Sequence, residues 1–293
     1  MPLTVLIVVT LAGGMVLTFA LGADAVSLLL GGAMVAATFA LTVGAWFRPQ
    51  RRERRAQERR IQRAAQRRAR RTRKVIHAAE RRLFSQLEAL AWLRDELDLR
   101  LPLPPTRGAA AAPDALLELV RRIDRHGVRS VLELGSGVST VVMARRLQQA
   151  GAGHVVSLEH MPEYAAATRA ELAAQGLGDY ATVVDAPLVE HELGGSTWSW
   201  YELGPRIPER VELLFIDGPP KRTGKLARYP ALPLLRDRLA PGAVALLDDG
   251  RRPDERAMVH RWAAEIEGLR IDELPLAKGA WLVTMPPATE GTP

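Results

Sequence analysis

The first 47 residues are almost continuously apolar, and this pattern ends at Arg48. Residues 3–22 and 25–47 form two apolar stretches. As helices rising about 1.5 Å per residue, stretches of this length can cross a hydrocarbon core of about 30 Å. We therefore expect residues 1–47 to form a two-helix transmembrane hairpin. A cleaved signal peptide is the alternative; it is disfavoured because no basic residue precedes the first stretch and a second apolar stretch follows at once.

A dense run of arginine follows the apolar region. Residues 48–74 hold fourteen Lys and Arg residues and two Glu, so this run supplies the formal charge of +7 and leaves the rest of the chain mildly acidic. The sequence after Pro49 predicts a juxtamembrane helix near anionic headgroups. Nucleic-acid binding is the alternative, but aromatic residues for base stacking are missing from the run. By the positive-inside rule we expect a multi-pass protein of the cell membrane whose following domain is cytoplasmic.

Residues 75–105 change to an amphipathic pattern that ends in the proline-rich sequence "LPLPP". Apolar residues recur there every three or four positions, which predicts a helix. The sequence leaves three roles open for this helix: a stalk, a lid on the next domain, or a coiled coil that makes a homodimer through 75–99. Its periodic apolar residues are Ile76, Ala79, Leu83, Leu87, Leu90, Leu93 and Leu97.

From residue 106 to 287, strand patterns alternate with helix patterns, which predicts a mainly parallel sheet covered by helices, a Rossmann-like α/β fold. Residues 288–293 are expected to be a flexible tail. The chain has no cysteine, which excludes disulfides and thiolate metal sites. The expected strands are 129–134, 154–159, 181–186, 211–217, 243–248, 269–274 and 280–285. The expected helices are 114–126, 138–150, 162–175, 226–239 and 253–267.

The first two strands of this domain end in residues that are typical of a nucleoside site. The segment "VLELGSGVST" places Glu133 before Gly135 and Gly137, and the next strand ends at Glu159. Glycines at a strand-to-helix turn let a ligand approach the backbone, and a carboxylate after the second strand can accept hydrogen bonds from ribose hydroxyls. The alternatives are an ordinary turn and an ordinary helix-capping acid.

Thr140 decides between two nucleoside cofactors. A dinucleotide fingerprint needs a third small residue at that position, where a β-branched side chain would crowd the pyrophosphate. The acid at Glu133 would also repel a diphosphate, whereas a sulfonium cation would tolerate it. The pattern therefore favours S-adenosylmethionine, with a nucleotide-dependent oxidoreductase as the less favoured alternative.

Two later strands deliver three acids to the same edge of the sheet. Asp217 follows "LLFI", while Asp248 and Asp249 follow "VALL". Oxygen ligands of this kind could hold Mg²⁺ or another divalent cation, and Asp217 or Asp249 could act as a catalytic base. The alternative is that these acids only cap a helix and order a loop.

Residues 191–210 form a long connection that carries three aromatic residues, Trp198, Trp200 and Tyr201. Loops at this end of a sheet commonly shape substrate access, so these side chains are candidates for acceptor binding; hydrophobic packing is the alternative. The basic segment 221–230 is expected to be a solvated loop, although it could meet an anionic acceptor. Lys278 is expected in a turn, without a catalytic role.

Four segments together resemble class I S-adenosylmethionine-dependent methyltransferases: "VLELGSGVST", "VVSLEH", "LLFIDGPP" and "LAPGAVALLDDG". The resemblance covers about 107 to 285 and implies a seven-stranded sheet whose last strand is antiparallel. There is also some likeness to cation-dependent small-molecule O-methyltransferases, which usually have Asp-Asn where this chain has Asp248-Asp249; the usual third glycine is Ser139. The expected cofactor-binding residues are Glu133, Gly135, Ser136, Gly137, Glu159, His160, Asp185, Ala186 and Asp217.

These observations predict a membrane-anchored methyltransferase that acts on an oxygen atom of a small-molecule, glycan or lipid-linked acceptor. The alternative from another class is a non-catalytic membrane scaffold built on a methyltransferase domain. Cofactor binding without turnover would favour the scaffold.

Overall fold

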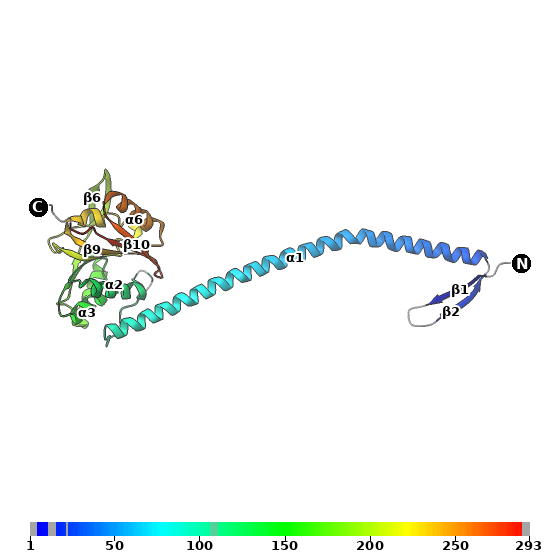
Figure 1. The fold of residues 1–293 in the computed structure, drawn as a ribbon, viewed down its shortest axis with the longest axis horizontal. Coiled ribbons are helices and arrows are strands. Elements are labelled where there is room, and N and C mark those ends of the chain that lie inside the picture. The colour runs from blue at the N-terminus through cyan, green and yellow to red at the C-terminus, as the bar shows by residue number, and fades with distance from the viewer. Residues whose placement is uncertain (1–4, 11–15, 22, 107, 109, 289–293) are drawn as a thin grey trace. The chain divides into compact units, whose positions relative to one another are not determined.

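The computed structural model describes residues 5–10, 16–21, 23–106, 108 and 110–288. The chain divides into two compact units, residues 1–77 and 78–293, which are described separately (Figure 1). The tail predicted at 288–293 lies, apart from residue 288, outside the described residues.

The first unit begins with a two-stranded antiparallel sheet, β1 (Val5–Thr10) and β2 (Val16–Leu21), in which Val5 pairs with Leu21. The prediction that residues 3–22 form the first helix of a transmembrane hairpin is therefore wrong. The segment "VLIVVT" is rich in β-branched residues, which favour strands over helices. Apolar length alone did not distinguish the two structures.

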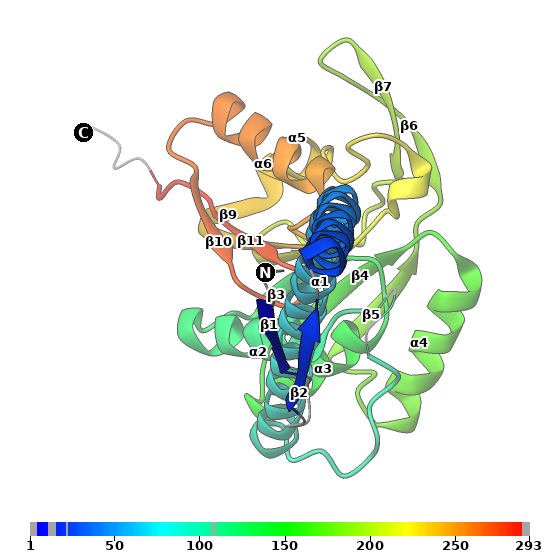
Figure 2. The same cartoon turned by 90° about the vertical axis from the view of Figure 1, so that its right-hand side faces the viewer.

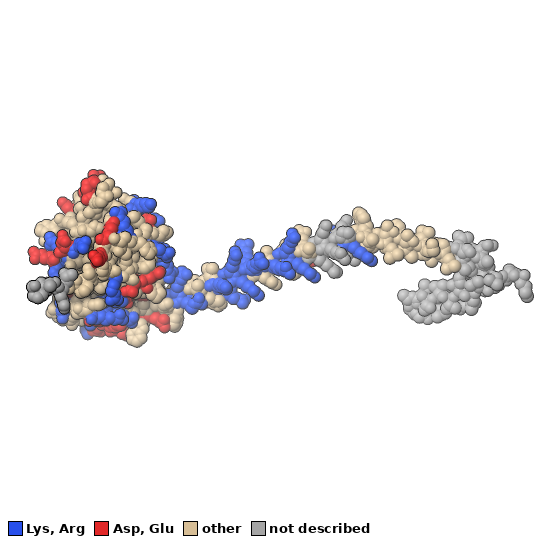
Figure 3. Space-filling model, turned by 45° about the horizontal axis from the view of Figure 1, so that its top comes forward, with Lys and Arg blue, Asp and Glu red and all other residues tan. Residues whose placement is uncertain are grey.

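A single helix, α1 (Ala23–Glu96), follows and continues through Pro49. The three helical segments expected over 25–99 are thus one element, because long runs of good helix formers on both sides outweigh the hydrogen bond that proline removes. Within the described residues, one stretch of this helix, Leu29–Arg48, is long and apolar enough to cross a membrane. This finding does not support the multi-pass topology. The described basic side chains of the run that follows, Arg48, Arg54 and those from Arg59 to Lys74, are exposed to solvent (Figure 3).

The second unit contains the predicted seven-stranded sheet, in the order β10-β11-β9-β8-β3-β4-β5. Neighbouring strands are parallel except that β11 is antiparallel to both β9 and β10. The Rossmann-like fold and the antiparallel last strand are confirmed. The strands are β3 (Ser130–Leu134), β4 (His154–Glu159), β5 (Ala181–Asp185), β8 (Val211–Ile216), β9 (Leu239–Asp248), β10 (Arg270–Leu274) and β11 (Ala280–Thr284).

Helices cover both faces of this sheet (Figure 2). Alternate side chains of each strand point to opposite faces, so Val131 packs with one helical layer and Leu132 with the other. One layer contains α2 (Pro113–His126), α3 (Val138–Gln149) and α4 (Pro162–Ala174); the other contains α5 (Ala231–Leu235) and α6 (Pro253–Glu265).

Two segments differ from the sequence-based expectation. The helix expected at 226–239 is reduced to α5 and a 3₁₀ turn, Arg236–Arg238, after a first 3₁₀ turn at Lys221–Thr223. The connection 191–210 is not an irregular loop. It contains most of an antiparallel hairpin of β6 (Leu188–Leu193) and β7 (Ser196–Tyr201), joined by a Gly-Gly turn of the kind that suits two-residue hairpins.

The C-terminal part of α1, from Ala78, belongs to the second unit. Two residues of the predicted apolar face, Leu93 and Leu97, are fully buried against the core that contains α2 and α3. Three others, Leu83, Leu87 and Leu90, remain 39 to 56% exposed. The predicted amphipathic face is therefore only partly used within this chain.

Candidate active site

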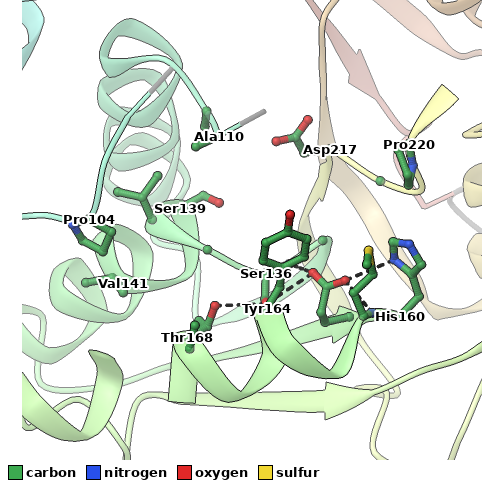
Figure 4. Close-up of a pocket in the computed structure, with 18 of the residues that line it drawn as sticks. Pro104, Ala110, Ser136, Ser139, Val141, His160, Tyr164, Thr168, Asp217 and Pro220 are labelled. Atoms are coloured by element: carbon green, nitrogen blue, oxygen red, sulfur yellow. Dashed lines mark hydrogen bonds and ion pairs between the residues drawn. The ribbon is translucent and has the colours of Figure 1, made fainter. Parts of the chain in front are cut away.

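A cavity of about 490 Å³ opens at the carboxyl ends of β3, β4 and β8. This is the edge at which open α/β sheets bind ligands. Its lining includes Gly135, Ser136, Gly137, Glu159, His160 and Asp217, of which Figure 4 labels Ser136, His160 and Asp217 around the cavity. Six of the nine residues predicted to bind a cofactor therefore lie around one cavity.

Glu133 does not line this cavity, because it is fully buried beneath the turn that follows β3. Thr140 Oγ1 donates to Glu133 Oε2 over 2.5 Å and accepts the Gly137 N–H over 3.0 Å. Burial raises the pKa of Glu133 to about 7, although the hydrogen bond from Thr140 opposes the shift. Glu133 therefore holds the glycine turn in place from below, through Thr140, rather than contacting a ligand directly.

Glu159 lies at the end of β4, where both of its carboxylate oxygens are fixed by the backbone. The Ser136 N–H donates to Oε2 and the Met161 N–H donates to Oε1, each over 2.9 Å. Burial disfavours the charged form, but the hydrogen bonds from His160, Met161 and Ser136 outweigh it and lower the pKa of Glu159. A carboxylate has about four acceptor positions, and the Ser136 hydroxyl over 3.4 Å and His160 Nδ1 over 3.1 Å approach the remaining two, so a diol in the cavity would have to replace the weaker of these contacts.

Asp185 and Ala186, at the end of β5, are set apart from this cavity. The Asp185 side chain is 60% exposed and accepts a hydrogen bond from Arg169 over 2.7 Å. Ala186 is buried in the core beside Trp200. Neither residue lines the cavity, because β5 is the edge strand and its end faces solvent and α4 instead.

The three predicted acids do converge. One carboxylate oxygen from each of Asp217, Asp248 and Asp249 lies within 4.8 Å of the other two. Asp217 lines the cavity, whereas Asp248 and Asp249 lie behind it, at the end of β9. Asp249 adopts a left-handed backbone conformation with φ of 61°, which is uncommon outside glycine and typical of functional sites. Burial raises the pKa of Asp217 to about 8, although the neighbouring Arg228 opposes the shift.

Cations of the chain itself already pair with these acids. Arg228 Nη2 donates to Asp217 Oδ1 over 3.1 Å and to Asp249 Oδ2 over 3.0 Å. Lys278 Nζ lies 3.4 Å from Asp248 Oδ2, and Arg252 Nη1 lies 2.8 Å from Asp249 Oδ2. A divalent cation needs several free oxygen ligands and no cation beside them, so the arrangement does not fit a metal ion.

Of the three predicted aromatic residues, one lines the cavity and two do not. Tyr201 lines the cavity with a buried hydroxyl that has no hydrogen-bond partner among the described residues. A Cβ atom on Gly218 would lie 2.1 Å from Tyr201 Oη, so only glycine allows this approach. Trp200 is fully buried in the core, and the Trp198 ring packs 4.8 Å from that of Tyr229. Only Tyr201 of the three lies where a ligand in the cavity could meet it.

Sequence reasoning missed several residues of the site. Arg228 was expected in a solvated loop, and Lys278 was assigned to a turn, yet both pair with the acids. Three acids that converge in a buried place need positive charge, and this requirement was the available signal. The cavity residues Met161, Tyr164 and Thr168 carried no motif that could have identified them.

Residues 132–250 match the family model described as a methyltransferase domain. This stretch runs from within β3 to just beyond β9 and contains the glycine turn, Glu159 and the three acids. The second unit therefore contains a stretch that matches a methyltransferase domain, in line with the resemblance that the sequence motifs indicated. No curated protein matches the chain in sequence.

Solved methyltransferase structures are similar to this chain at low identity. SAH-bound PaMTH1 from Podospora anserina is 17% identical, with 68% of this chain and 86% of that chain covered and a TM-score of 0.45. Cofactor-bound Rv0187 from MTB is 23% identical, with 68% and 90% covered and a TM-score of 0.44. The O-methyltransferase from Bacillus cereus in complex with SAH is 18% identical, with 68% and 90% covered and a TM-score of 0.44. Similarity at this level does not identify a substrate.

Proposed function

We propose that the second unit binds S-adenosylmethionine in the cavity and transfers its methyl group to an oxygen acceptor. The observation that carries this proposal is Glu159. Its carboxylate lines the cavity and is fixed by two backbone N–H groups, and ribose hydroxyls would replace the long contact of 3.4 Å from the Ser136 hydroxyl. The cavity volume of about 490 Å³ lies in the range typical of small-molecule sites.

The cofactor, when bound, supplies an electrophilic methyl group on a sulfonium. The protein must hold the acceptor oxygen about 3–3.5 Å from that carbon and exclude water. In such a transfer a C–O bond would replace the S–CH₃ bond with the electron pair remaining on sulfur, so the part of this chain would be to hold the acceptor oxygen and to take up its proton. Asp217 is the cavity carboxylate placed to receive that proton, whereas Asp249 lies behind it between Arg228 and Arg252. The proposal includes no metal, because chain cations pair with the acids.

The pH dependence of turnover tests this role of Asp217. A base must be ionised to accept a proton, and burial raises the pKa of Asp217 to about 8. We expect methyl transfer to rise with pH up to about 8 and then to level off. An Asp217→Asn variant should bind the cofactor and lose most of its turnover, and a pH profile that is flat from 6 to 9 would exclude Asp217 as the base.

Cofactor binding is the direct test of the proposed function. Calorimetric titration of the purified full-length chain with S-adenosylmethionine should give stoichiometric binding, and a nicotinamide dinucleotide should give none. Absence of heat and of any thermal shift at millimolar S-adenosylmethionine would overturn the proposal. Binding without turnover over a broad screen of hydroxyl acceptors would favour the non-catalytic scaffold instead.

We further propose that the chain is anchored by the apolar segment Leu29–Arg48, with the basic run 48–74 against anionic headgroups. The positive-inside rule then places the methyltransferase domain in the cytoplasm. An anchor of this kind suits a small-molecule, glycan or lipid-linked acceptor close to the membrane. Membrane fractionation after alkaline washing tests it: recovery of the full chain in the wash would exclude an integral anchor.

Self-association is the second partner proposal. The exposed residues Leu83, Leu87 and Leu90 recur at helical spacing on the part of α1 that belongs to the second unit. A homodimer through 75–99 would bury them. Sedimentation of the full chain in detergent, compared with a Leu83→Glu/Leu87→Glu variant, tests this pairing: an equal monomer mass for both would exclude it.

A further inference from the structure

Arg228 occupies an unusual position for a charged side chain. It lies in the basic segment 221–230 after β8, yet it is only 3% exposed. Burying a guanidinium is costly unless it is paired and hydrogen-bonded. The partners that stabilise it are therefore the first clue to its role.

These partners come from the ends of two neighbouring strands. Arg228 Nη2 donates to the Asp217 backbone carbonyl over 2.7 Å and to the carboxylates of Asp217 and Asp249. Its Nη1 donates to the Asp248 carbonyl over 3.1 Å. The planar guanidinium thus joins the end of β8 to the end of β9 through both backbone and side-chain oxygens. Hard divalent cations use the same kinds of oxygen atoms as ligands.

A second cation, on the segment between β10 and β11, also contacts the acid cluster. Lys278, before β11, places Nζ 3.4 Å from Asp248 Oδ2 and 3.9 Å from Asp249 Oδ1, and donates to the Ala110 carbonyl over 2.9 Å. Each of the three acids therefore has a chain cation within ion-pair distance. A metal ion among them would lie beside two fixed positive charges that repel it.

We propose that Arg228, assisted by Lys278, takes the place of a divalent cation at this site, so that the acid cluster binds no metal and the domain works without one. Arg228 is a positioning residue: it fixes Asp217 in the cavity wall and joins the two strand ends. The inference deepens the proposed methyl transfer by assigning its electrostatics to the chain, and it can fail independently of that proposal.

Manganese binding to the full-length chain in detergent is the first test, measured by the loss of the free Mn²⁺ paramagnetic resonance signal. The wild-type chain should leave this signal unchanged up to about 1 mM, the weak end of protein sites for divalent cations. A stoichiometric site that is lost in Asp217→Asn would overturn the inference. Calorimetry with S-adenosylmethionine on the same sample reports separately on the proposed function.

Variants that remove the cations make the opposite prediction. In Arg228→Met/Lys278→Met the carboxylates of Asp217 and Asp248 are freed while Asp249 keeps its pairing with Arg252, so we expect Mn²⁺ to bind at least tenfold more tightly than to wild type and to raise the melting temperature. Adding Asp217→Asn to the double variant should abolish this Mn²⁺ binding. The exposed control Arg206→Met should bind as little Mn²⁺ as the wild-type chain. Equal manganese affinity in wild type and the double variant would count against the inference. Should the double variant not fold, the wild-type titration still decides.

Discussion

The buried carboxylates at and behind the cavity have different hydrogen-bond and ion-pair partners on its β3–β4 side and on its β8–β9 side. On the β3–β4 side, Glu133 is held by the hydroxyl of Thr140, and Glu159 is fixed by backbone N–H groups. On the β8–β9 side, the acids are paired with Arg228 and Lys278. The first side uses backbone and hydroxyl donors, of which the Ser136 hydroxyl at 3.4 Å is weak enough for a ligand to replace, whereas the second side uses cations.

Under the proposed function, this difference assigns cofactor binding to the β3–β4 side and the positioning of Asp217 to the β8–β9 side. A carboxylate fixed by neutral donors keeps its charge available to a bound molecule, as Glu159 does in the cavity lining. A carboxylate paired with a buried cation acts as part of the framework. Asp217 lies at the boundary, because it faces the cavity while its other side contacts Arg228.

Removal of Arg228 should have the largest effect. Arg228→Met leaves buried acids without their counter-charge, so we expect the free energy of unfolding to fall by about 3–5 kcal/mol. Chemical denaturation measures this loss, and the exposed control Arg206→Met should change it by less than about 0.5 kcal/mol. The combination Arg228→Met/Asp217→Asn should lose less than the sum of the two single changes. Strict additivity would show that the pair is not coupled.

Glu133 should control the pH dependence of stability. Its pKa is raised from 4.5 to about 7 in the folded chain, so the unfolded chain loses the proton first and stability falls as pH rises between those values. At about 1.4 kcal/mol per pKa unit, the difference in unfolding free energy between pH 4.5 and 8 is about 2–3 kcal/mol. Glu133→Gln should remove this part of the slope and be the more stable protein at pH 8. Parallel stability curves for the two proteins would contradict the assignment.

Glu159 should matter for affinity. Hydrogen bonds to charged groups contribute about 1.5–3 kcal/mol, so Glu159→Gln should weaken S-adenosylmethionine binding by roughly 10- to 100-fold in calorimetry. Asp185→Asn is the matched control at the next strand end, and should change affinity less than about twofold. An equal loss in both variants would extend the nucleoside site to the end of β5, as the sequence motifs predicted.

The smallest effect concerns two tyrosine hydroxyls. Tyr201→Phe removes a buried hydroxyl without a partner among the described residues, so unfolding free energy should stay unchanged or rise slightly. Tyr229→Phe removes a hydrogen bond of 2.6 Å to Glu265 and should lower it by about 1 kcal/mol. Equal losses in thermal denaturation would mean that the Tyr201 hydroxyl is satisfied within the fold and is not free for a ligand.

The seven strands and the glycine turn after β3 were predictable because they follow from local patterns, and the antiparallel last strand was implied by the family resemblance. Strand ends such as Glu159 and Asp217 can be located from periodicity alone, since parallel strands deliver their ends to one edge. Apolar length did not predict that the first apolar stretch would contain strand β1 while the second would belong to helix α1. Neither was the burial of Arg228, because its partners come from segments distant in the sequence and its neighbours resemble a solvated loop.

The β6–β7 hairpin is buried at its base and exposed at its turn. Trp200 and Tyr201 are buried, with Tyr201 seated against Gly218, while the turn at Gly194 and Gly195 is exposed. Residues can therefore be inserted at this turn while the buried end of the hairpin and the packing of Trp198 on Tyr229 stay in place.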